Sequence, residues 1–328
     1  MPEYIYVSSG VISTGINVKN NTMYILSGGT ASDTTADFGG YIFIDSYGKA
    51  FTTVVNSGGI LIFFSDAFAS GTTVNSGGSM EVREYAIASG VTVNKGGRLT
   101  VANGSAVQVV ENGGYVTCYD SKDVSFLPGS FSGLTLDAPA TVHSGTVAAR
   151  TYISDGGKLM IFSDGRASQT TVYSGGEFGV YSGGVASETI VYDYCAVTGG
   201  SMAYTAINSG GSVVVDSKGA ANYTDVNPGG TLIVYDDCTA REIKENGGVV
   251  AVGLENTQIS FVPNVLSGAT LYDEASIHSG TILTDTTLDS KVRVYVYSGG
   301  IVSKTTLNND SASISCFDAG TLDSITVS

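Results

Sequence analysis

Three pentapeptides of one pattern decide the fold of this chain. Val55–Gly59 reads VNSGG, Val74–Gly78 repeats it, and Val93–Gly97 reads VNKGG. The asparagine of this motif recurs every nineteen positions. A fixed period near twenty residues is typical of an array in which each copy is one structural unit.

Apolar residues alternate with variable residues after each glycine pair. Leu61 and Phe63 in one copy correspond to Met80 and Val82 in the next. This period of two indicates strands, and no copy has the apolar spacing of a helix. Glycine allows the positive φ angles of a sharp corner, and the Ala-Ser-Gly run at Ala69–Gly71 predicts a second, softer corner. Each copy is therefore interpreted as short strands joined by corners.

One copy is too short to bury its own apolar side chains, whereas stacked copies place equivalent side chains on top of one another. Neighbouring strands lie about 4.8 Å apart, so a coil of about nineteen residues that rises by this distance gives a parallel β-helix. We therefore predict an all-β solenoid, continuous over residues 1–328. A flat sandwich would also alternate, but it gives no reason for an asparagine at one phase of a constant period.

The spacing of the glycine doublets divides the predicted solenoid into segments. Doublets are irregular near the N-terminus, regular in the middle repeats, and missing from the centre of two longer blocks. The segments are an irregular N-terminal cap with the first coils (1–50), regular repeats (51–97), and two longer blocks (98–178 and 232–313). Residues 314–328 form a last strand, in which apolar and polar residues still alternate at the end of the sequence, as expected if the solenoid is truncated there.

The two longer blocks are copies of each other and contain the candidate site residues. An offset of 135 places Pro128 on Pro263 and His143 on His278, the latter two being the only histidines. The prolines and the missing doublets predict a bulge or an inserted loop. These four residues are the candidates for a binding surface that occurs twice. The alternative is that duplication copied an inert corner residue.

We expect no catalytic residue, no cofactor site and no metal site. A catalytic histidine needs a nucleophile and an orienting carboxylate within reach, and the spacing of residues supplies neither. The glycine doublets do not join a strand to a helix, so they are not nucleotide-binding loops. The adjacent carboxylates Asp236 and Asp237 have no counterpart on neighbouring coils, which favours a solvated corner over an acid–base pair.

Charge and apolar content exclude several classes of partner. Lys and Arg total 15 against 30 Asp and Glu, a net charge of −15. Such a chain repels phosphate backbones and anionic membrane surfaces. No segment approaches the ~18 consecutive apolar residues of a membrane span, and Met1–Val7 lacks the basic and apolar regions of a secretory signal. We therefore expect neither nucleic-acid binding nor direct membrane insertion.

Cysteine and tyrosine give weaker indications. The cysteines at 118, 195, 238 and 316 form no close pair, so they are expected to be free thiols buried in strands, with pairing across a loop as the alternative. Tyrosine occurs 19 times. Its rings are expected to pack within the coils or along a face, and the alternative is that outward rows bind sugar rings or another solenoid.

The repeat over Ser57–Gly78 and Ser76–Gly97 has the order Ser-Gly-Gly, alternating apolar residues, a small-residue corner, and Val-Asn-Ser/Lys-Gly-Gly. It resembles the repeat of AIDA-type autotransporter passengers, the adhesins of diffuse adherence. The resemblance implies a right-handed β-helix displayed outside the cell. It also implies adhesion or self-association, with Ser and Thr as glycan acceptors.

These observations predict a non-enzymatic surface or secreted repeat protein. Adhesion or self-association would use a long lateral face rich in Ser, Thr and Tyr, and the partners would be other copies of the chain or a host-surface protein or glycan. One alternative is a polysaccharide-active β-helix enzyme, which requires carboxylates clustered on adjacent coils. The other is an intracellular scaffold that polymerises end to end.

Overall fold

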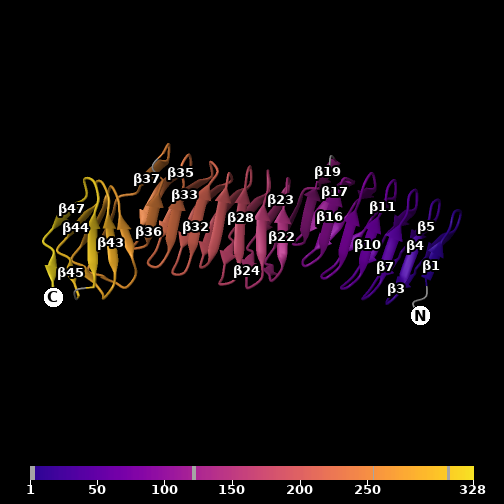
Figure 1. The fold of residues 1–328 in the computed structure, drawn as a ribbon, viewed down its shortest axis with the longest axis horizontal. Helices are drawn as coiled ribbons and strands as arrows, with labels where there is room; N and C mark the ends of the chain where they lie inside the picture. Colours follow the sequence, from indigo (N-terminus) through magenta and orange to yellow (C-terminus); the bar gives the residue numbers. More distant parts are fainter. Residues whose placement is uncertain (1–3, 120–122, 254, 309–310) are drawn as a thin grey trace. The chain divides into compact units, whose positions relative to one another are not determined.

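The computed structural model describes residues 4–119, 123–253, 255–308 and 311–328, so Met1–Glu3 of the expected cap lie outside the described residues. All secondary-structure elements in these ranges are β-strands, and the paired strands are parallel (Figure 1). Contacts divide the chain into two units, mainly 1–149 and 150–328, with 156–160 and 164–166 belonging to the first. The all-β parallel solenoid predicted from the repeat is confirmed.

Unit 1 is built from coils that each contribute one strand to each of three faces. Face 1 contains β1 (Tyr4–Val7), β4 (Thr22–Ile25), β7 (Tyr41–Ile44), β10 (Ile60–Phe63), β13 (Ser79–Val82), β16 (Arg98–Ala102) and β18 (Tyr115–Tyr119). Face 2 contains β2 (Ile12–Thr14), β5 (Thr30–Ser32), β8 (Lys49–Phe51), β11 (Phe68–Ser70), β14 (Ile87–Ser89), β17 (Ser105–Asn112) and β19 (Asp123–Phe126). Face 3 contains β3 (Asn17–Val18), β6 (Thr35–Ala36), β9 (Val54–Val55), β12 (Thr73–Val74) and β15 (Thr92–Asn94), and ends on the second half of β17.

The core of unit 1 consists of columns of equivalent side chains. Leu61 pairs with Met80, and Met80 with Leu99, in the register of face 1. Val55 and Val74 are likewise neighbours on face 3, and all of these residues are fully buried. Inward and outward residues alternate along these face 1 strands, so the inward side chains of stacked coils bury apolar area against one another.

The two glycines of each doublet are required for different reasons. Gly58 has φ of +74°, which L-residues with side chains adopt at a cost. Gly59 has ordinary backbone angles, but a Cβ on it would lie 2.2 Å from the Ala36 carbonyl oxygen of the preceding coil. The doublet therefore turns the chain at its first residue and allows close stacking at its second.

The recurring asparagines form a ladder of side-chain amides. Asn75 Nδ2 donates to Asn56 Oδ1 and Asn94 Nδ2 donates to Asn75 Oδ1, both at 2.8 Å. Asn56 Nδ2 donates in turn to Asp37 Oδ1 at 2.8 Å, and hydrogen bonds from Asn56 and then Asn17 lower the pKa of Asp37. The amides of the ladder therefore all donate in the same direction along the stack, and the ladder ends at the Asp37 carboxylate. A second ladder joins Asn208, Asn227, Asn246 and Asn264.

Replacing Asn75 by alanine is expected to destabilise unit 1 by about 1–3 kcal/mol, because it removes two amide–amide hydrogen bonds and leaves a part-buried donor unpaired. Urea unfolding followed by circular dichroism measures this free energy. The neighbouring exposed Ser76→Ala is the matched control and should change it by less than about 0.5 kcal/mol. Equal midpoints for the two variants would show that the ladder is energetically neutral.

Residues 1–50 differ from the expected irregular cap. From Tyr4 onward they form regular coils, in which Tyr4 pairs with Thr22 and Ile12 with Thr30. The irregularity lies in the glycine spacing alone. Gly28–Gly29 and Gly39–Gly40 occupy two different corners of one coil, since Gly29 aligns with Gly48 and Gly40 with Gly59.

Unit 1 continues beyond face 1 with four further strands. They are β20 (Gly129–Ser132), β21 (Thr135–Leu136), β22 (Pro139–Val142) and β23 (Thr146–Ala149), and the division between the units runs through β25 (Lys158–Ile161) and β26 (Arg166–Ser168). β20 pairs with β23, with Gly129 opposite Thr146.

Unit 2 contains longer strands in which two faces merge. One sheet holds β28 (Glu177–Tyr181), β30 (Tyr194–Thr198), β32 (Ser212–Asp216), β34 (Thr231–Val234) and β36 (Val249–Val252). The other holds β29 (Val185–Val191), β31 (Ser201–Ile207), β33 (Ala220–Val226), β35 (Thr239–Glu245) and β37 (Gln258–Phe261). In the same sheet β27 (Thr171–Val172) pairs with β29, and β24 (Tyr152–Ile153) pairs with β27.

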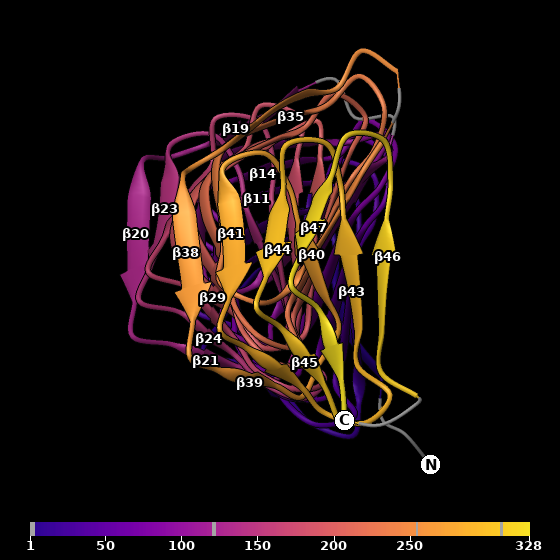
Figure 2. The same ribbon diagram turned by 90° about the vertical axis from the view of Figure 1, so that its left-hand side faces the viewer.

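The last coils of unit 2 return to three separate faces, seen side by side in Figure 2. The first holds β38 (Asn264–Ser267), β41 (Thr281–Thr284), β44 (Ile301–Ser303) and β47 (Thr321–Asp323). The second holds β39 (Thr270–Leu271), β42 (Thr287–Leu288), β45 (Thr306–Leu307) and β48 (Thr326–Val327), and the third holds β40 (Ala275–Ile277), β43 (Arg293–Val296) and β46 (Ser313–Cys316).

All four cysteines are free thiols. Cys195 and Cys238 are buried as expected, but the expectation is wrong for Cys118 and Cys316, which are exposed. Both exposed thiols have the inward phase of their strands. Each stands on the last strand of its sheet, β18 or β46, so no further strand of that sheet covers it.

Candidate functional site

The two duplicated blocks change the pairing partner of the chain at their prolines. The Leu127 amide donates to the Val109 carbonyl of the preceding coil at 2.8 Å. Pro128 has no N–H, and the Gly129 amide then donates to the Gly145 carbonyl of the following coil at 3.2 Å. Pro263 stands at the same step between Val262 and Asn264. The pairings of β17 with β19 and of β35 with β37 each contain a register shift, with the extra residue in β17 and in β35, and the prolines follow β19 and β37.

A buried glutamate lies at the first switch. Glu111 follows Val93 in the buried column of face 3, and its side chain has no exposed area. Its Oε1 accepts from the Thr141 hydroxyl at 2.7 Å and contacts His143 Nδ1 at 2.8 Å. Its Oε2 accepts from the His143 amide at 2.7 Å. The carboxylate therefore joins the end of one stack to the start of the next, and we call Glu111, Thr141 and His143 the first splice.

The second switch repeats this geometry. Glu245 Oε1 accepts from the Ser276 hydroxyl at 2.7 Å and contacts His278 Nδ1 at 2.7 Å, while Oε2 accepts from the His278 amide at 2.8 Å. Glu245 is fully buried and follows Val226 in its column. Glu245, Ser276 and His278 form the second splice.

The hydroxyl of each splice replaces a backbone acceptor. The Val116 amide of β18 donates to Thr141 Oγ1 at 3.0 Å, and the Val250 amide of β36 donates to Ser276 Oγ at 2.8 Å. Each hydroxyl accepts from the strand below and donates to the glutamate. This accounts for a hydroxyl residue at both positions, since an unpaired buried amide would cost about 1–3 kcal/mol.

Aromatic rings cover the imidazoles. His143 stacks on Phe126 at 4.4 Å between centroids. His278 lies between Phe261 at 4.5 Å and Tyr297 at 4.4 Å. Because a carboxylate oxygen accepts hydrogen bonds, each glutamate orients Nδ1 as the donor nitrogen of its imidazole. The hydroxyls, however, donate to the carboxylate and not to the imidazole, so this geometry does not form the nucleophile–base pair of hydrolases.

His143 and Pro128 lie in one region of the structure. Gly145, two positions after His143, packs against Pro128: a Cβ added to Gly145 would lie 3.5 Å from Pro128 Cα. Sequence reasoning missed the two glutamates, whose offset is 134 and not 135. A signal existed, since each acid occupies a column otherwise filled by aliphatic residues, mostly valine.

The described residues hold no group of three or more His, Cys, Asp or Glu side chains arranged for a metal ion. Over the same ranges, no helix is long and apolar enough to cross a membrane.

Comparison with known proteins identifies the regular repeats. Residues 55–97 match the family model described as adhesin of bacterial autotransporter system, probable stalk. Residues 55–97 are an AIDA-type stalk repeat. No curated protein matches the sequence. Among solved structures, the TibC-catalysed hyper-glycosylated TibA fragment is 25% identical, covering 98% of this chain and 100% of the fragment at a TM-score of 0.40.

The pentapeptide-repeat protein HetL of Nostoc is 11% identical, covering 95% of this chain and 87% of HetL at a TM-score of 0.14. Both scores are below 0.5, so the fold assignment rests on the strand pairing of this chain. The family match itself covers residues 55–97.

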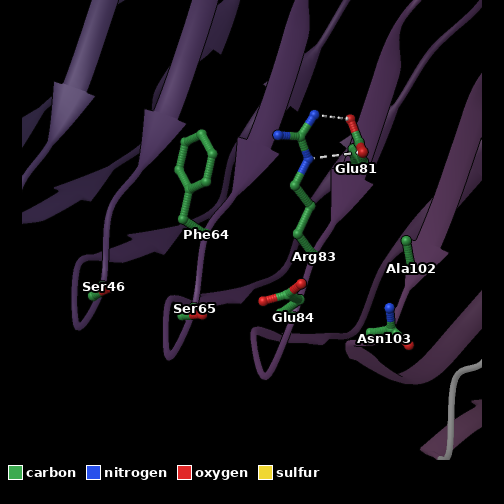
Figure 3. Close-up of a pocket in the computed structure, with 8 residues that line it drawn as sticks. All are labelled: Ser46, Phe64, Ser65, Glu81, Arg83, Glu84, Ala102 and Asn103. Atoms are coloured by element: carbon green, nitrogen blue, oxygen red, sulfur yellow. Dashed lines mark hydrogen bonds and ion pairs between the residues drawn. The ribbon is translucent and has the colours of Figure 1, made fainter.

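The AIDA-type repeat carries one shallow cavity of about 500 Å³ at the ends of its face 1 strands (Figure 3). Arg83 donates to both carboxylate oxygens of Glu81, at 2.8 and 2.9 Å, and its guanidinium lies 5.4 Å from the centre of the Phe64 ring of the preceding coil. Glu84 and Asn103 line the same cavity. Arg83 and Glu81 therefore form a bidentate ion pair at the surface of the repeat.

Proposed function

We propose that this chain is a non-enzymatic passenger segment of a bacterial surface adhesin. It would mediate adhesion or self-association through its lateral faces, with other copies, host-surface proteins or glycans as partners. The observation that carries the proposal is the AIDA-type repeat itself, matched over residues 55–97 and folded into coils that present equivalent side chains at every step.

The lateral surface supports this proposal. Ser57 and Ser76 are exposed at equivalent corners of successive coils, and only 14% of residues are charged. A partner could therefore make the same weak contact on many coils, and such contacts add up when they act together. The exposed corner serines are also the positions that we propose as acceptors of O-linked glycans.

Beads coated with the purified chain test this function. We expect them to aggregate or to attach to epithelial cells more than beads coated with the urea-unfolded chain. Soluble polysaccharides incubated with the chain should release no new reducing ends. Beads that neither aggregate nor attach would refute the adhesion proposal, and released reducing ends would favour the enzyme alternative.

A further inference from the structure

A lateral groove follows the coils of unit 2. Two cavities, of about 470 and 340 Å³, share Tyr204 and Ala206 in their linings. The first extends toward Tyr152 and Gln169, and the second toward Lys244. Because they share lining residues, the two cavities are parts of one groove that crosses several successive coils.

The groove arises from one backbone bend per coil. Its ridge consists of non-glycine residues with positive φ that lie above one another in register: Gln169, Glu188, Tyr204, Tyr223 and Glu242. Outward residues two positions later form the opposite side, including Thr171, Ile190, Ala206, Asp225 and Lys244. The same bend that joins two faces into one long strand therefore makes the concave surface.

Two tyrosines in this ridge occupy a conformation that favours glycine. Tyr204 and Tyr223 have φ of 57° and 54°. The equivalent bend in unit 1 is occupied by Gly71 and Gly90, and also by non-glycine residues such as Thr52. A bulky residue is strained in this region, whereas glycine is not. The fold can thus make the bend without these tyrosines.

The strain is not explained by burial. The two rings stack at 4.8 Å with 8° between their planes, yet Tyr204 is 61% and Tyr223 52% exposed. The two rings therefore add little to the core and are accessible to a ligand. Their rings stand where the two cavities meet, with Tyr204 lining both and Tyr223 the second.

We propose that this groove binds a neutral, linear glycan chain, a proposal that names the partner for the adhesion function proposed above and rests on it. The coils advance by about 4.8 Å, close to the length of one pyranose ring, so one sugar can meet equivalent side chains on each coil. An extended peptide advances by about 3.3 Å per residue, so its successive residues would not stay aligned with successive coils.

The charges of the groove fit an uncharged chain. Two cations, Arg150 and Lys244, stand with three carboxylates, those of Glu188, Asp225 and Glu242. The Gln169 amide donates to Glu188 at 3.0 Å. Planar amide and carboxylate groups bind sugar hydroxyls, and tyrosine rings contact sugar C–H faces. An acidic glycan would meet a chain whose net charge is −15.

Binding of neutral linear hexasaccharides of glucose, mannose, galactose and N-acetylglucosamine to the full chain tests the proposal by titration calorimetry. At least one should bind saturably, and polygalacturonate should not. The double variant Tyr204→Gly/Tyr223→Gly should lose about tenfold in affinity per ring, equivalent to about 1.4 kcal/mol each. Its thermal midpoint should stay equal or rise, because glycine relieves the strain.

Tyr85 provides the matched control, since it is 75% exposed with φ of 58° and lies outside both cavities. Tyr85→Gly should leave binding unchanged. Ala206→Arg fills the part of the groove that both cavities share and should abolish binding. This test does not depend on whether the tyrosine double variant folds. Wild-type affinity in the Ala206 variant, or no saturable binding of any hexasaccharide, overturns the glycan proposal.

The two proposals fail separately. Coated beads that attach to cells while no hexasaccharide binds would leave the adhesion function standing without this ligand. Hexasaccharide binding by a chain whose beads neither aggregate nor attach would retain the groove and remove the adhesion function.

Discussion

Replacing Glu245 by alanine is expected to destabilise the second splice by about 3–5 kcal/mol. The side chain is fully buried and receives hydrogen bonds from the Ser276 hydroxyl, the His278 amide and the His278 imidazole. Alanine leaves all three without their acceptor in a site that water does not reach. Urea unfolding measures the total effect, and faster hydrogen exchange at the Ser276 and His278 amides locates it.

Two further variants sharpen this prediction. Glu245→Gln keeps the shape and one acceptor oxygen but places an NH₂ group against a donor, so its cost should be intermediate. Glu274→Gln changes an exposed carboxylate in the same block and should alter stability by less than about 0.5 kcal/mol. If Glu245→Ala unfolded at the same urea concentration as Glu274→Gln, the splice would contribute nothing measurable to stability.

Adding one methyl group at Gly59 is expected to destabilise unit 1 by about 3 kcal/mol or more. The Cβ of Gly59→Ala would lie 2.2 Å from the Ala36 carbonyl oxygen and 2.7 Å from its carbon. Both atoms belong to the backbone of the neighbouring coil, so a rotamer change cannot relieve the overlap. The coils must separate locally, which lengthens the hydrogen bonds of the adjacent strands. Thermal and urea unfolding report the loss.

A matched substitution separates this overlap from the general effect of losing a glycine. Gly71 has φ of +73°, but its nearest neighbours would lie 3.7 Å from an added Cβ. Asparagine tolerates this conformation, and the chain itself has Asp33, Thr52 and Gln108 at this bend. Gly71→Asn should therefore cost about 1 kcal/mol or less. Equal losses in the two variants would show that the coils separate easily.

The candidate residues illustrate how far residue patterns can predict a site. The offset between the two histidines and between the two prolines identified the duplicated blocks, and the structure places each pair in matching surroundings. It did not identify Glu111 and Glu245, because an acidic residue within a strand is normally assigned to the outer face. Their burial depends on donors more than thirty positions later in the chain, which no local pattern contains.

The groove of unit 2 also depends on contacts between coils that no local sequence pattern contains. Tyr204 and Tyr223 alternate like ordinary outward residues in the sequence. Their positive φ angles and mutual stacking exist only once register aligns one coil with the next.

The sequence by itself determined the all-β class, the nineteen-residue coil and the parallel stacking. In a solenoid each coil packs mainly on the coils next to it, so the pattern of one repeat is enough to predict how it pairs with the next. The tertiary structure alone decided where that repetition is interrupted and what the interruptions bury. At Pro128 and Pro263 the chain changes pairing partners, and the backbone, hydroxyl and imidazole donors there must be satisfied from a distant coil. A buried carboxylate satisfies three of them at once, and its position follows from the three-dimensional register of the coils.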